Sequence, residues 1–326
     1  MEGYKSMNIL ILILFVSISN TVSIHVGYYD RKCPQAESIV RQVVERKFSK
    51  DNSIAAALLR MHFHDCFVKG CDASILIDST TDTEAVEKDA GPNLTVREFD
   101  LIDEIKSELE AACPKKVSCA DIIALATRDA VSLAGGPTYK AHTGRRDGVV
   151  SRASDVNLPG PSSTVAQAQE AFTAHGLTLK DMVALLGGHT LGVTHCGFFS
   201  DRLSNFQGTG APDSTMDTGL GKRLRGVCGS DPGVDPTVSL DQSTPLVFDN
   251  KFYNEIKNKR GVLKIDQELA LDRLSAKWVS NFAANNTVFE QGFVKAILKL
   301  GNIHILQGNR GGEIRKNCRV VNKIKN

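Results

Sequence analysis

Apolar residues recur every three or four positions along most of the chain, which is the spacing of amphipathic helices. One such run is followed by Gly135-Gly136-Pro137 and another ends at Gly187-Gly188, as helix C-termini commonly do. Alternating strand patterns are scarce, and the glycine-rich stretch 207–221 is expected to be an irregular connection. The expected helices cover 39–48, 99–109, 119–133, 179–186 and 289–300. The chain is therefore predicted to be mostly α-helical.

The domain organisation follows from what the sequence lacks. It has no internal repeat and no low-complexity linker, so two lobes closing over a cleft are favoured over separable domains. Near the start, Lys5 precedes a short apolar run over 9–16 and then small and polar residues up to Ser23. This order predicts a cleaved secretory signal at 1–23, because the apolar run is too short to span a bilayer. The remaining residues, about 300, can bury a core large enough to hold a cofactor.

Eight cysteines make an even number in a chain predicted to enter an oxidising compartment, which favours disulfides. Zinc binding is the alternative, but the close pair Cys66 and Cys71 lacks the second close pair of a structural zinc site. Eight cysteines allow about 105 pairings, so their connectivity cannot be read from the spacing.

The charges are nearly balanced, with 39 Lys and Arg against 37 Asp and Glu and a net charge of +2. No basic cluster is interleaved with aromatic residues, so a nucleic acid is not a predicted partner. No second apolar run approaches transmembrane length, so a membrane is not one either.

The densest polar chemistry lies at 60–74. Arg60 and His64 are four residues apart and share one face of a helix, with Phe63 beside them as an apolar wall. A metal hydrolase that uses His62 and His64 as ligands is one alternative. That alternative is weak, because residues two apart on a helix point in different directions and no His-Glu-x-x-His motif is present.

A second group of candidate residues lies at 186–198. His189 follows two glycines, which lack side chains and allow a flat group to approach closely. Taken alone, the pattern is more typical of a capped helix followed by a hydrogen-bonded histidine than of a ligand. Nucleotide binding is not supported, because no strand precedes the glycines and the Gly-x-Gly spacing is absent.

Several widely spaced motifs together resemble the secreted class III plant haem peroxidases. The resemblance runs from about Tyr28 to Asn322 and includes all eight cysteines. It implies an all-α haem peroxidase fold in which two helical lobes enclose haem, with little β-structure and four disulfides. The implied single domain covers 24–326, with a distal lobe at about 24–160, a proximal lobe at about 161–300 and a C-terminal segment held back by a disulfide. The motifs are Arg60 to Ser74, Gly144-Arg145-Arg146-Asp147-Gly148, Asn157-Leu158-Pro159, Gly187 to Cys196 and Asp241 to Tyr253.

The resemblance implies roles at both faces of the haem. His189 would bind the iron, and Asp266 would accept a hydrogen bond from its other nitrogen. The alternative for Asp266 is an ordinary helix N-cap. On the opposite face His64 would act as the base and Arg60 would stabilise developing charge, with Asn93 orienting His64 and Phe63 beside it.

Two calcium sites are implied next to the two histidines, since carboxylate, hydroxyl and carbonyl oxygens are the ligands that calcium prefers. The alternative is that these are solvated acidic loops. The distal ligands would be Asp65, Asp72, Ser74, Glu87 and the carbonyls of Val68 and Gly70. The proximal ligands would be Thr190, Asp241, Thr244, Asp249 and the carbonyl of Val247.

The resemblance also implies covalent and substrate features. Pro159 and Phe198 would lie where reducing substrates approach, although an ordinary turn and a core ring are the alternatives. Asn93-Leu94-Thr95 is a glycosylation sequon, but a pocket-facing Asn93 would leave Asn285 as the better acceptor. The implied disulfides are Cys33–Cys113, Cys66–Cys71, Cys119–Cys318 and Cys196–Cys228.

The implied protein is a secreted peroxidase with one haem b and two calcium ions. It would reduce hydrogen peroxide and oxidise small phenolic donors in two one-electron steps, in lignification, wall cross-linking or the response to oxidative stress. A monomer in the cell wall or apoplast is expected, with the vacuole less favoured and wall polysaccharide a further candidate partner. The alternative is a non-enzymatic extracellular protein that keeps the fold and binds calcium and the wall.

Overall fold

The computed structural model describes residues 24–80, 84–229, 233–308 and 311–322. The predicted signal segment 1–23 lies outside the described residues. Within them, no helix combines the length and the apolar character needed to cross a membrane. Helices dominate, and the one sheet among the described residues pairs the short strands β1 (Val193–His195) and β2 (Thr237–Ser239) antiparallel. The prediction of a mostly helical chain is confirmed.

The first group of helices forms around α4 (Cys119–Leu133), which packs against three others. All but its last two residues are buried, as its alanine-rich sequence permits. Short 3₁₀ helices η1 (Ser74–Leu76), η2 (Glu87–Asp89) and η3 (Gly91–Asn93) lie in the long connection that follows α2. The partners of α4 are α1 (Ala36–Phe48), α2 (Ile54–Cys66) and α3 (Phe99–Ala112).

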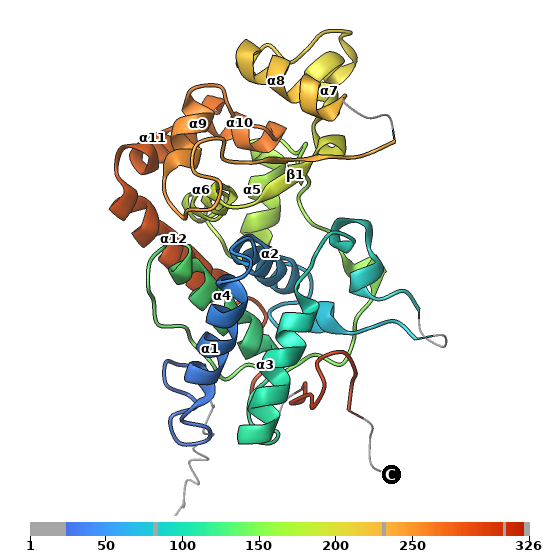
Figure 1. The fold of residues 1–326 in the computed structure, drawn as a ribbon, viewed down its shortest axis with the longest axis vertical. Coiled ribbons are helices and arrows are strands. Elements are labelled where there is room, and N and C mark those ends of the chain that lie inside the picture. Colours follow the sequence, from blue (N-terminus) through green and yellow to red (C-terminus); the bar gives the residue numbers. More distant parts are fainter. Residues whose placement is uncertain (1–23, 81–83, 230–232, 309–310, 323–326) are drawn as a thin grey trace, which may run out of the picture.

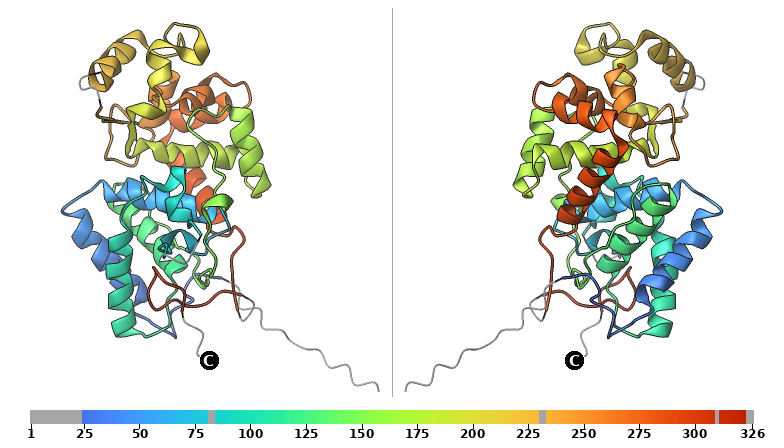
Figure 2. Two further views of the ribbon diagram at one scale, coloured as in Figure 1. Left: turned by 90° about the vertical axis from the view of Figure 1, so that its right-hand side faces the viewer. Right: turned by 90° about the vertical axis from the view of Figure 1, so that its left-hand side faces the viewer.

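The second group is stacked on the first, and α12 (Asn286–Leu300) runs from one toward the other (Figures 1 and 2). Helix α12 packs against α6 (Leu179–Leu186), and the rings of Tyr253, Phe282 and Phe289 fill the space behind α6. The other elements here are α5 (Val165–Ala174), η5 (Gly187–Thr190), η6 (Cys196–Phe198), α7 (Ser200–Ser204), η7 (Phe206–Gly208), α8 (Thr218–Cys228), α9 (Lys251–Lys257), α10 (Lys264–Leu271) and α11 (Ala276–Ala284). The 3₁₀ helix η4 (Ala153–Asp155) belongs with the first group, where it contacts η2.

The expectation that 207–221 is an irregular connection is wrong for its last residues, because α8 begins at Thr218. The Asp217 side chain caps this helix by accepting a hydrogen bond from the Leu220 amide at 2.8 Å. Leu220 and Leu224 are four apart and buried, while Gly219 and Gly221 dilute the apolar pattern. The cap and the buried leucines outweigh the low helix propensity of glycine.

Buried polar contacts connect the first group to distant parts of the chain. The Asp121 carboxylate accepts hydrogen bonds from the Tyr29 hydroxyl at 2.6 Å and from the Arg145 guanidinium at 2.8 Å. Arg145 also donates to the carbonyl of Gly301, just after α12. The Asp147 carboxylate accepts from the amides of Ala120 and Arg315 at 2.9 and 2.8 Å. The C-terminal segment is thus part of the core of the first group.

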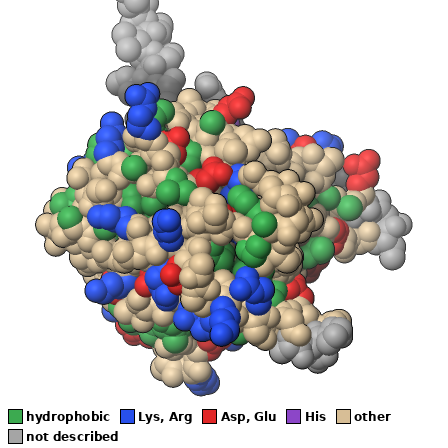
Figure 3. All heavy atoms as spheres, turned by 90° about the horizontal axis from the view of Figure 1, so that it is seen from above, with side chains coloured by type: hydrophobic (Ala, Val, Ile, Leu, Met, Phe, Trp, Pro, Cys, Tyr) green, Lys and Arg blue, Asp and Glu red, His purple; other side chains and the backbone are tan. Residues whose placement is uncertain are grey.

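The end that carries α7 and α8 shows no field of a single charge. Lys and Arg side chains are spread over this face with Asp and Glu between them (Figure 3). This distribution agrees with the balanced composition.

The junction of α6 and η5 depends on glycine. A Cβ atom at Gly187 would lie 2.1 Å from the Tyr253 hydroxyl oxygen and 2.6 Å from the Phe289 ring. The backbone at Gly187 is ordinary right-handed helix, so the constraint is the space and not the conformation. His189 lies two residues further on, and its position depends on this close packing.

We expect Gly187→Ala to destabilise the protein by about 1–3 kcal/mol, the usual range for overpacking a filled core. Gly226→Ala is the matched control, because a Cβ there meets nothing within 4 Å inside α8. The control should be neutral or stabilising by about 0.5–1 kcal/mol, since alanine favours a helix. Chemical denaturation measures both, and equal midpoints for the two variants would contradict the expectation.

Candidate functional site

His64 is held by a buried amide. Its Nδ1 lies 2.6 Å from Oδ1 of Asn93, and Nδ2 of Asn93 donates to the Glu87 carbonyl at 2.7 Å. Because the Glu87 carbonyl can only accept, it fixes the amide with Oδ1 toward the imidazole. His64 therefore carries its proton on Nδ1, and Nε2 is left as an acceptor.

Arg60 is held by the same short segment. Its guanidinium donates to the Thr95 hydroxyl at 3.0 Å and to the Pro92 carbonyl at 2.8 Å. Residues 92–95 therefore position Arg60 and His64 together. In the sequence, Thr95 stands out only as part of a glycosylation sequon. The four-residue spacing of Arg60 and His64 was the one signal that the two share an environment.

Burial sets the charge state of the imidazole. Removal from water and the positive charge of Arg60 lower the pKa of His64 to about 4. The ring is therefore neutral at physiological pH. Phe63 lies beside it, with ring centres 5.9 Å apart, and packs on Phe67 at 4.6 Å. A neutral imidazole against an apolar wall can accept a proton.

His189 is held by a buried carboxylate. Its Nδ1 lies 2.8 Å from Oδ1 of Asp266. Burial opposes protonation of His189, but the charge of Asp266 and its hydrogen bond to the ring together outweigh burial and raise the pKa of His189. The alternative role of Asp266 as a helix N-cap is wrong. Leu263 is the N-cap of α10, and Asp266 lies inside the first turn.

The accessible side of the His189 ring is suited to binding iron. About 31% of its side chain is accessible although Gly187, Gly188 and Thr190 around it are buried, so the ring faces a space in the protein. With Nδ1 occupied by a carboxylate, Nε2 is the nitrogen available, and haem iron is commonly held by such a histidine.

The two histidines lie on elements in mutual contact. Helix α2 packs against η5, and a Cβ on Gly188 would lie 2.9 Å from Cδ2 of Leu59, the residue before Arg60. The charge of Arg60 also acts on the pKa of His189. Residues predicted from two separate motifs are thus brought together.

Buried oxygens without partners gather after His64. Neither carboxylate oxygen of Asp65 or Glu87, nor the Ser74 hydroxyl, has a hydrogen-bond partner among the described residues. Burial and the neighbouring charges of Asp72 and Glu87 raise the pKa of Asp65 well above its usual range, and burial raises that of Glu87 to about 8. Unpaired buried carboxylates are costly, and a hard cation would remove that cost.

A second oxygen cluster follows His189. The Thr190 hydroxyl lies 3.2 Å from an Asp241 carboxylate oxygen, 3.3 Å from the Val247 carbonyl and 3.4 Å from an Asp249 carboxylate oxygen. The Thr244 hydroxyl lies 3.1 Å from the same Asp249 oxygen. The five residues predicted as the proximal ligands therefore converge, and their donor set suits calcium.

The remaining predicted residues are those of the disulfides, the glycosylation site and the donor-binding region. The four disulfides are Cys33–Cys113, Cys66–Cys71, Cys119–Cys318 and Cys196–Cys228, the set that the resemblance implies. Asn93 is 1% exposed, whereas Asn285 is exposed and caps α12. Phe198 is 48% exposed, so it is not the core ring of the alternative, and Pro159 is half-buried.

His62 does not form the alternative metal site. It lies close to the sulfur atoms of Cys66 and Cys71, but those atoms form a disulfide and are not thiolate ligands. Burial lowers the pKa of His62 to about 3, so the ring is neutral. Neither ring nitrogen has a hydrogen-bond partner among the described residues.

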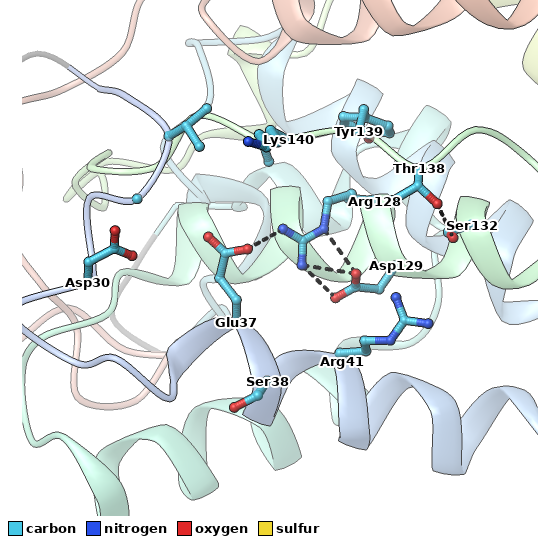
Figure 4. A pocket seen from close by; sticks show the side chains of 13 residues that line it. Asp30, Glu37, Ser38, Arg41, Arg128, Asp129, Ser132, Thr138, Tyr139 and Lys140 are labelled. Atoms are coloured by element: carbon cyan, nitrogen blue, oxygen red, sulfur yellow. Dashed lines mark hydrogen bonds and ion pairs between the residues drawn. The ribbon is translucent and has the colours of Figure 1, made fainter.

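A surface hollow of about 450 Å³ lies away from these residues, between α1, α4 and the segment 138–141 (Figure 4). Its central cation is Arg128, which donates to both carboxylate oxygens of Asp129 and to Glu37. The pair with Glu37 joins α4 to α1, and the two ion pairs together satisfy the guanidinium without a ligand.

Comparison with known proteins agrees with this geometry. A family model described as Peroxidase matches residues 40–285. Peroxidase 57 of Arabidopsis thaliana is 53% identical over 322 residues, covering 99% of this chain and 100% of that protein. Peroxidase 44 of the same plant is 51% identical over 312 residues, with 95% and 97% covered. Peroxidase C2 of Armoracia rusticana is 44% identical over 323 residues, with 96% and 91% covered. The chain belongs to the peroxidase family, and within it to the class III plant peroxidases.

Proposed function

We propose that this peroxidase holds one haem b between His189 and His64, reduces hydrogen peroxide and oxidises small phenolic donors in two one-electron steps. When bound, haem supplies the iron at which the O–O bond is cleaved and from which donors are oxidised. The observation that carries the proposal is that buried acceptors engage Nδ1 of both histidines, at 2.6 and 2.8 Å. Each Nε2 is thereby left available, and α2 and η5, the elements that carry the two histidines, lie in contact.

His189 would bind the haem iron through Nε2. The Asp266 carboxylate accepts a hydrogen bond from Nδ1–H and gives the imidazole anionic character, which strengthens it as a donor toward iron. Asp266 is fully buried, so water does not compete for this hydrogen bond. Its second role is to fix the ring plane, because the bond comes from a helix packed against α5 and α9.

His64 would move the proton of the substrate. Its neutral Nε2 accepts a proton from one oxygen of hydrogen peroxide and returns it to the other oxygen, which leaves as water. Asn93 keeps the ring proton on Nδ1 throughout. Arg60 would donate hydrogen bonds to the oxygen on which negative charge develops, from a position set by Thr95 and Pro92.

Donors would approach near Pro159 and Phe198. The half-exposed Phe198 ring can contact an aromatic donor, and the neighbouring Gly197 leaves that position open. The segment after Pro159 is anchored to the helix that carries Asp266, since the Pro161 carbonyl accepts from the Ile265 amide at 3.1 Å.

Two calcium ions would occupy the oxygen clusters. The distal ion would take Asp65, Asp72, Ser74, Glu87 and the carbonyls of Val68 and Gly70, and the proximal ion the cluster around Thr190 and Asp241. His64 directly precedes Asp65, and His189 directly precedes Thr190. Each ion would therefore fix the backbone that orients one histidine.

The setting proposed for this activity is the cell wall or apoplast, with the protein secreted as a monomer and glycosylated at Asn285. Wall polysaccharide is a further proposed partner. A non-enzymatic wall protein is not favoured, because Arg60, His64 and Asp266 keep the contacts that catalysis needs.

We expect His64→Ala to slow the reaction with hydrogen peroxide by about 10²–10⁴-fold, the usual contribution of a general base. Stopped-flow absorbance of the haem band measures this step. His142→Ala is the control, since His142 lies in the first group with none of these contacts and should react like wild type. A rate within a few-fold of wild type in His64→Ala would remove His64 from the mechanism.

Chelation of calcium should lower both activity and thermal stability, because the buried carboxylates then repel one another beside the histidines. Asp65→Asn should reduce the calcium content from two ions to one by elemental analysis. Glu84→Gln is the control, since this side chain is 87% exposed. Full activity in protein shown to be free of metal would refute the role of calcium.

A further inference from the structure

Two histidines outside the proposed haem and calcium sites lie next to each other, with their rings tilted. His175 follows α5, and His304 lies in the segment after α12. Their ring centres are 5.8 Å apart with the planes at 57°. The pair joins two segments distant in sequence, so no local pattern predicts it.

The spacing suits a shared metal ion. With metal–nitrogen bonds of about 2.0–2.1 Å, two imidazoles on one ion have ring centres about 5–6 Å apart. His304 is exposed and His175 half-buried, so an ion can reach the pair from solvent.

The state of each residue favours a ligand role. Nδ1 of His175 is shielded from solvent and has no hydrogen-bond partner among the described residues. Burial, with a contribution from His304, lowers the pKa of His175, so this ring is neutral as a metal ligand must be. His304 has a positive φ of 41°, a costly conformation for a residue with a side chain, and such residues cluster at ligand clamps.

We propose that His175 and His304 form a binding site for a divalent transition metal of the Zn²⁺, Ni²⁺ and Cu²⁺ class, with water completing the coordination. Imidazole nitrogen selects these ions, whereas the oxygen clusters suit calcium. The ligands of this site are therefore of a different chemical type from those of the two proposed calcium sites.

An ion here would hold the loop that follows α2. The His175 ring lies 4.4 Å from the Phe67 ring, and Phe67 contacts Phe63 beside His64. A Cβ on Gly70 would lie 2.7 Å from both Cβ and the carbonyl oxygen of His304. The metal would therefore clamp α5 and the segment after α12 over residues 67–70.

The test uses the holoenzyme with haem and calcium bound. Zn²⁺ is titrated by calorimetry, and calcium content is measured in parallel. Cu²⁺ is examined by electron paramagnetic resonance, which reports the number of nitrogen ligands. Wild type should bind one zinc ion without losing calcium and show at least two nitrogens on copper.

His175→Ala and His304→Ala should each weaken zinc binding on the order of tenfold or more, and the double variant should lose little further affinity. His195→Ala is the matched control, because His195 lies 3.5 Å from the Asp235 carboxylate and is the competing place for an ion. The control should bind zinc like wild type.

Three results would overturn the proposal. One is absence of zinc uptake by wild type at concentrations well above that of the protein. Another is wild-type affinity in both His175→Ala and His304→Ala. The third is binding that disappears in His195→Ala or that releases calcium.

Discussion

The hydrogen bond on Nδ1 of each proposed haem-facing histidine is the interaction on which the rest of this site depends. Asn93 binds one ring as a neutral acceptor, and Asp266 binds the other as an anion. Because one acceptor is neutral and the other is charged, the two imidazoles differ in pKa. One has a pKa lowered to about 4, and the other has a raised pKa. Burial of both partners protects the contrast from water.

The two oxygen clusters act on the backbone that carries the two histidines. Asp65 and Thr190 each follow a histidine directly, so any force on their oxygens acts one peptide bond from an imidazole. At the distal cluster the carboxylates of Asp65 and Glu87 are unpaired, whereas at the proximal cluster hydroxyls already lie 3.1–3.4 Å from the carboxylate oxygens. The distal cluster therefore has the greater need of a cation.

The sequence predicts best where the information is local. The periodicity over 119–133 and 179–186 gives α4 and α6 with their observed bounds, because apolar spacing and glycine stops act within one element. The periodicity does not predict the helix that begins at Thr218, where an Asp cap and two buried leucines outweigh the low helix propensity of glycine. Arg60 and His64 share an environment, as their spacing predicts. The Thr95 contact and the pair of His175 and His304 depend on tertiary packing, which local patterns do not encode. The disulfide pairing could be anticipated only through the family resemblance.

The bond between Cys119 and Cys318 has a consequence for biosynthesis. Its partners are separated by 199 positions, and Arg315 and Gly301 supply further contacts from the C-terminal part of the chain to the same helical group. The amino-terminal half therefore cannot reach its final packing while the polypeptide is still emerging from the ribosome. A product that ends before Cys318 would leave the thiol of Cys119 without its disulfide partner.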